Sequence, residues 1–168
     1  MRFEPFLLDR LCEAPEHAPT AVDGARWRMS LEQVKDSVAR DLESLLNTRS
    51  AWRAQDTRMW RHAGRSVLSF GLMDFVGLSL DNPDHRDTIC QSIASAILHH
   101  EPRLKAVVVK LIDTSTLGLG LRFSIHATLV INPAIEPVSF DAVLQPTTQR
   151  YAVRQSARRT AERGALRG

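Results

Sequence analysis

The chain has few of the residues that build catalytic or metal-binding signatures. Its only cysteines, Cys12 and Cys90, stand far apart and outside any Cys/His spacing of a zinc site. So few cysteines also suit a reducing compartment, where disulfides do not persist. The sequence has no G-x-S-x-G nucleophile motif, and Gly118-Leu119-Gly120 lacks the third glycine of a phosphate-binding loop. We therefore expect neither a metal nor a cofactor.

Long apolar runs are also missing. The N-terminal stretch "MRFEPFLLDRLCEAPEH" is interrupted by Glu4, Asp9 and Arg10, so it has no continuous apolar region of a secretory signal. No run approaches the roughly 20 apolar residues that a membrane helix needs. The composition, 43% hydrophobic and 24% charged, is ordinary for a soluble globular protein. We expect a cytoplasmic protein.

Acidic residues are scarce at the C-terminal end. Between residues 146 and 168, six arginines stand against Glu162 alone. These arginines are Arg150, Arg154, Arg158, Arg159, Arg163 and Arg167. A basic tail can bind nucleic acid, but no aromatic residue follows Tyr151 to stack on a base. We predict an N-terminal amphipathic segment and loop at 1–29, a domain at 30–145 and an arginine-rich tail at 146–168.

Two helices precede the strands in the predicted order. Ser30 and Gln33 form a capping box that starts the first helix, which ends at Asn47 because asparagine tolerates the left-handed conformation. The inward face of this helix carries Leu31, Val34, Val38, Leu42 and Leu45, spaced by three and four. Asn82-Pro83 opens the second helix, which Pro102 brings to an end. Between the helices, the apolar stretch 66–80 predicts a buried, tightly turned segment.

Alternating apolar residues predict strands after the second helix. Residues 104–111 are valine-rich, 121–129 alternate strictly, and 138–144 are apolar on alternate positions at both ends. Helices followed by strands predict an α+β fold, with N-terminal helices packed on a small antiparallel sheet of three or four strands. An open sheet edge can template a strand of another chain.

The corner between the second helix and the first strand reads Glu101-Pro102-Arg103. Glu101 is the strongest candidate for a catalytic acid, but Arg103 favours its ionised form and no spacing singles out a second carboxylate. A docking latch for a partner and a solvated helix end are the alternatives. The preceding His99 and His100 point in different directions on a helix, so a metal site is disfavoured.

Six segments in order resemble the TssE family of type VI secretion systems. They are "FLLDRL" at 6–11, "LESLLNTRS" at 42–50, "SVLSFGLMDFVGLSL" at 66–80, "HHEPRLKAVVVKL" at 99–111, "FSIHATL" at 123–129 and "VSFDAVL" at 138–144. This family is similar to the small wedge protein of contractile phage tail baseplates, often labelled "lysozyme-like". The resemblance covers nearly the whole chain to about Val153.

The resemblance implies a structural protein of the cytosolic baseplate rather than an enzyme. It implies contacts with the wedge subunits TssF and TssG, and a sheet edge on which the contractile sheath subunits assemble. The family's Glu-Pro-Arg motif maps onto Glu101, Pro102 and Arg103, which would then be partner-binding residues. We expect Glu101→Ala or Arg103→Ala to weaken assembly and to leave the isolated fold intact. The remaining alternatives are a peptidoglycan-cleaving enzyme that uses Glu101 and a nucleic-acid-binding module that uses the basic tail.

Overall fold

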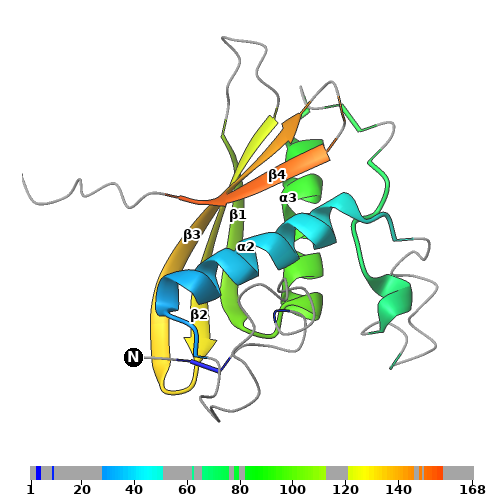
Figure 1. Cartoon of the computed structure of the whole chain (residues 1–168). Helices are drawn as coiled ribbons and strands as arrows, with labels where there is room; N and C mark the ends of the chain where they lie inside the picture. The colour runs from blue at the N-terminus through cyan, green and yellow to red at the C-terminus, as the bar shows by residue number, and fades with distance from the viewer. Residues whose placement is uncertain are drawn as a thin grey trace, which may run out of the picture.

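The computed structural model describes residues 3–4, 9, 28–50, 62, 66–75, 78–79, 82–112, 121–145, 148 and 150–156. The helices are α2 (Leu31–Asn47), the short 3₁₀ helix η3 (Val67–Ser69) and α3 (Pro83–His100). The strands are β1 (Leu104–Ile112), β2 (Leu121–Ile131), β3 (Ala134–Gln145) and β4 (Arg150–Gln155). They form one antiparallel sheet in the order β1-β2-β3-β4 (Figure 1). The predicted α+β fold is confirmed.

Helix α2 begins with the predicted capping box. The N–H of Gln33 donates to Ser30 Oγ at 3.2 Å, and the N–H of Ser30 donates to Gln33 Oε1 at 2.7 Å. The helix ends at Asn47 as predicted, but not through a left-handed residue. Thr48, the C-cap, is extended, with φ −93° and ψ 138°. The Asn47 side-chain amide instead forms hydrogen bonds with β4, a strand that the prediction missed.

Helix α3 also follows the prediction. The Asn82 side chain accepts from the N–H of Asp84 at 2.9 Å, and Pro83 occupies the first helical position, where a missing N–H costs nothing. Its inward face buries Ile89, Ile93 and Ile97. With α2, these side chains join one hydrophobic core.

The sheet has one buried face and one open face. In β2, Phe123, Ile125 and Ala127 are buried, whereas Arg122 before Phe123 and His126 before Ala127 are exposed. Cross-strand partners continue the same pattern on their strands, so both helices cover a single face and leave the other open. The alternation of apolar and polar residues in the sequence therefore placed β2 correctly.

The sheet continues beyond the predicted strands. β3 begins at Ala134 rather than at residue 138, and β4 lies within the segment assigned to the basic tail. Tyr151 and Val153 of β4 are only 5% and 6% exposed. This part of the predicted tail therefore belongs to the core of the fold.

The apolar segment 66–80 is buried only in part. Val67 is 85% exposed, Leu68 47% and Met73 42%, so the predicted burial is wrong at these residues. Leu72 is fully buried and forms backbone hydrogen bonds with Thr48 and Ser50. Among the described residues of this segment, Leu72 is anchored at the end of α2, and Phe70, Phe75 and Leu78 pack against the core.

A glycine makes this anchor possible. Gly71 has a φ of 115°, which side chains rarely allow, and a Cβ there would lie 2.5 Å from the Thr48 carbonyl oxygen. The predicted tight turn is therefore confirmed at Gly71.

Candidate functional site

The corner between α3 and β1 turns two charged side chains inward. The N–H of Glu101 donates to the Ile97 carbonyl at 2.8 Å and caps α3, and the N–H of Leu104 donates back to the Glu101 carbonyl at 3.1 Å. Pro102 is exposed at the tip. Glu101 and Arg103 on either side of it are only 5% and 8% exposed. Of the three motif residues, only the proline lies on the surface of this chain.

Glu101 and Arg103 form a bidentate ion pair. Arg103 Nε donates to Glu101 Oε1 at 2.6 Å, and Nη2 donates to Oε2. The Arg103 backbone N–H also donates to Oε1, at 3.2 Å. Both carboxylate oxygens are therefore occupied. Such a pair is geometrically specific because guanidinium and carboxylate are both planar.

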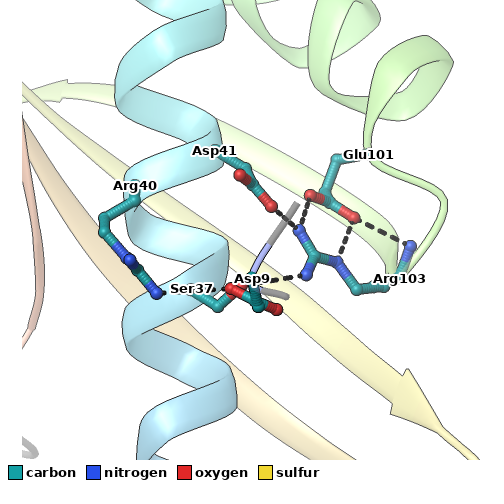
Figure 2. Close-up of polar contacts among 6 residues, drawn as sticks. All are labelled: Asp9, Ser37, Arg40, Asp41, Glu101 and Arg103. Carbon is teal, nitrogen blue, oxygen red and sulfur yellow. Dashed lines mark hydrogen bonds and ion pairs between the residues drawn. The ribbon is translucent and has the colours of Figure 1, made fainter. Parts of the chain in front are cut away.

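The same guanidinium reaches across to α2 (Figure 2). Arg103 Nη2 pairs with Asp41 Oδ2, and Nη1 donates to Ser37 Oγ at 3.4 Å. Ser37 and Asp41 are four residues apart, so they lie on one side of the helix. Arg103 thus joins the α3–β1 corner to a helix about sixty residues earlier in the chain.

Two carboxylates hold Arg103 in its charged form. Burial acts to lower the pKa of Arg103, but the hydrogen bonds and charges of Glu101 and Asp41 outweigh it, so the pKa is raised. The Asp41 side chain is 34% exposed and gives this cluster a partly solvated side. Nearby, Arg40 pairs with Asp9 at 3.3 Å. The cluster is a fixed arrangement of charges that reaches the surface beside α2.

This arrangement is unsuited to general acid catalysis by Glu101. A glycosidase acid must be protonated and must reach its substrate. Glu101 is 5% exposed, and both of its carboxylate oxygens already accept hydrogen bonds from Arg103. An open groove of about 1170 Å³ lies elsewhere, lined by Glu32 and Lys35 of α2 and by sheet residues that include Arg122, His126 and Asp141.

The two histidines before the corner have separate partners. His100 Nε2 lies 2.9 Å from the Ser69 carbonyl, and its ring meets Phe70 edge-on at 5.4 Å. His99 Nδ1 instead lies 2.7 Å from the Ser95 carbonyl of its own helix. In the part of the chain that the structure describes, no group of three or more potential ligands could hold a metal ion.

Sequence reasoning missed a second set of contacts, in which α2 holds the outer edge of β4. Asn47 Nδ2 donates to the Tyr151 carbonyl and Oδ1 accepts from the Tyr151 N–H, both at 2.8 Å. Glu43 Oε2 accepts from the N–H of Val153 at 2.9 Å. Glu43 and Asn47 are also four residues apart. This spacing, repeated in Ser37 and Asp41, was the available signal, but it does not say what each pair contacts.

The basic segments are only partly described. Arg150 and Arg154 lie in β4 and are exposed. The other tail arginines, Arg158, Arg159, Arg163 and Arg167, lie outside the described residues, and so do residues 113–120, which include Gly118 and Gly120. The helices among the described residues are too short or too polar to cross a membrane.

Comparison with known families identifies the family of this chain. A family model for the baseplate wedge protein gp25 matches residues 32–134. The chain belongs to this family. The match runs from the first turn of α2 to the start of β3, so Asp41, Glu101 and Arg103 of this baseplate wedge protein all lie inside it. No curated protein matches the chain.

Proposed function

We propose that this baseplate wedge protein is a structural subunit of a type VI secretion system and has no catalytic role. It acts on the cytoplasmic side of the envelope, joins the wedge subunits TssF and TssG, and templates the contractile sheath by strand addition. The observation that carries this proposal is the family match over residues 32–134. The order of the six sequence segments supports the secretion system rather than a phage tail.

The α3–β1 corner is the proposed contact with the other wedge subunits. Pro102 offers an exposed, rigid tip, and the Glu101–Arg103 pair beneath it fixes the direction of that tip. The partly exposed Asp41 adds a charge at the same surface. Charges at an interface chiefly set register and partner choice, so a fixed cluster suits a subunit that must dock in one orientation.

Co-purification from cells that carry the secretion system tests this function. Tagged wild type should recover TssF, TssG and the sheath subunits. Pro102→Glu places a charge at the exposed tip without touching the buried pair, so it should lower the recovery of TssF and TssG and leave the melting temperature unchanged. Thr148→Glu is a matched control, because Thr148 is exposed in the turn before β4.

Two outcomes would count against the proposal. If wild type recovers no baseplate or sheath subunit, the secretion-system assignment is wrong. If Pro102→Glu and Thr148→Glu recover the same amounts as wild type, the corner is not the wedge contact.

The enzyme alternative has a direct test as well. Purified protein should leave a suspension of cell walls as turbid as buffer does. Clearance by wild type that is lost in Glu101→Gln would establish a peptidoglycan-cleaving activity.

A further inference from the structure

The two edges of the sheet differ in which of their outward backbone groups are already bonded to a helix. In an antiparallel strand the N–H and C=O of one residue point to the same side, and those of the next residue point to the other. The backbone N–H and C=O groups of Tyr151 and Val153 in β4 point away from β3, because three of these groups bond to α2. Asn47 and Glu43 occupy three of these outward groups. A strand that approached β4 would have to displace them.

The part of β3 that extends beyond β4 is also poorly suited to pairing. The Ser139 carbonyl already accepts from the Ser156 N–H at 2.9 Å. The next residue with the same orientation is Pro137, which has no N–H to donate. Proline at an exposed edge interrupts the ladder of hydrogen bonds that strand addition requires. The β4 side of the sheet is therefore closed at Tyr151 and at the Val153 N–H and is interrupted at Pro137, with Gln155 between these two stretches.

The outer edge of β1 is different. The Val130 N–H donates to the Arg103 carbonyl at 2.8 Å, so the backbone groups of Val130 in β2 point toward β1. By alternation, the backbone groups of His126 and Ser124 point the same way. Their partners Val108 and Lys110 must then point inward. Val109, between them, points outward.

Beyond β1, the described part of the sheet has no further strand. Leu111 also points outward, and its N–H is bonded to the Cys90 thiol of α3. The bulge between Lys105 and Val108, where Ala106 has a φ of 50°, limits the regular edge at its other end. The available edge is therefore short and centred on Val109.

The open face beside this edge is basic and partly apolar. Lys105, Lys110 and the neighbouring Arg122 are all exposed on it. Between them, Val108 is 50% exposed and Ile112 is 38% exposed. An added strand with acidic and apolar side chains on this face would match both features, since opposite charges on neighbouring strands stabilise a sheet.

We propose that β1 is the edge that accepts the sheath, and that its occupant is an extended segment of the sheath subunit with acidic and apolar side chains on the open face. The two α2 side chains Glu43 and Asn47 close the β4 edge and so direct the added strand to β1. This inference rests on the proposed templating function and goes further by naming the edge and the chemistry of the segment.

A proline scan of the two edges tests the choice of edge. Val109→Pro removes the outward N–H at the centre of β1 and leaves the ladder to β2 intact. Gln155→Pro is the matched control, since Gln155 has the same outward orientation on β4. With purified sheath subunit, Val109→Pro should weaken binding by about tenfold or more, and Gln155→Pro by less than about twofold.

Charge reversal tests the chemistry of the segment without altering the backbone. The double variant Lys105→Glu/Lys110→Glu should weaken sheath binding by about tenfold at low salt, and the difference should shrink as salt is added. Arg154→Glu is the control, because Arg154 is an exposed arginine on the β4 side of the sheet. An unchanged affinity of the double variant would overturn the proposal that the sheath segment carries acidic side chains.

Amide exchange on the wild-type complex decides the edge even if Val109→Pro fails to fold. Binding should slow exchange at Val109 and leave Tyr151 and Val153 unchanged. Slower exchange at β4 instead, with β1 unaffected, would overturn this inference and leave the templating function standing. If the purified sheath subunit does not bind wild type at all, the templating function and this inference are both wrong.

Discussion

Helix α2 holds two regions of the molecule by different means. At the α3–β1 corner, Asp41 and Ser37 hold a buried arginine that is itself paired with Glu101. At β4, Asn47 and Glu43 hold backbone groups of an edge strand. The first region depends on balanced charge within the fold, whereas the second depends on part-buried hydrogen bonds to backbone groups. This difference predicts that the two regions tolerate substitution unequally. The following experiments rank them by the stability that each substitution costs.

The largest expected effect is loss of the arginine at the corner. Arg103→Ala leaves Glu101 buried at 5% exposure without its counter-charge, so the free energy of unfolding should fall by about 3–5 kcal/mol. Urea denaturation measures this. The burial of the pair therefore revises the expectation that this substitution leaves the isolated fold intact, and makes Pro102 the better probe of assembly.

A paired substitution separates charge balance from packing. Glu101→Leu/Arg103→Met removes both buried charges and keeps apolar volume at the corner. It should recover a large part of the stability lost in Arg103→Ala, because replacing a whole buried ion pair is often neutral. If the double variant is less stable than Arg103→Ala, the loss arises from the shape of the corner rather than from an unpaired charge.

A smaller effect is expected at β4. Asn47→Ala leaves the Tyr151 N–H and C=O without their partners and should lower the free energy of unfolding by about 1–3 kcal/mol. Amide exchange at Tyr151 should speed up by more than it does at Phe123 in the centre of the sheet. Asn47→Asp keeps the acceptor for the Tyr151 N–H but loses the donor for the Tyr151 carbonyl. Its free energy of unfolding should therefore lie between those of wild type and Asn47→Ala. Equal stability of all three proteins would mean that β4 is held by packing alone.

The contrast between these regions also explains what the sequence could predict. Local signals placed the elements correctly: the Ser30 capping box, the Asn82-Pro83 start of α3 and the strict alternation in β2. The motif itself brought attention to Glu101 and Arg103. Such signals depend on neighbours within a few residues, and the structure uses them as expected.

Contacts between distant elements could not be predicted in this way. Asp41 and Asn47 look like ordinary polar residues of an amphipathic helix, and only the folded chain shows that one meets Arg103 and the other meets Tyr151. β4 was missed because it has few apolar residues among arginines. Val67 was placed in the core because the surrounding run is apolar, yet it lies on a short surface helix.

The smallest effect is expected from pH, at a histidine that links η3 to the end of α3. Burial lowers the pKa of His100 below its ordinary value of 6.5, the Ser69 carbonyl acts to raise it, and the nearby His99 lowers it further. The unfolded chain then binds a proton more readily than the folded chain. The contribution of His100 to stability should therefore be present above pH 6.5 and should be lost as the pH falls below it.

Urea denaturation between about pH 7.5 and about pH 5.5 measures this slope. His100→Gln keeps a donor for the Ser69 carbonyl and cannot take up the proton, so its stability should change less over this range. His126→Gln is the matched control, because His126 is exposed on the open face and bonds only to the hydroxyls of Ser124 and Ser139 among the described residues. If His100→Gln retains the wild-type slope, the pH dependence arises from another group, and the contact between η3 and α3 does not depend on the charge of His100.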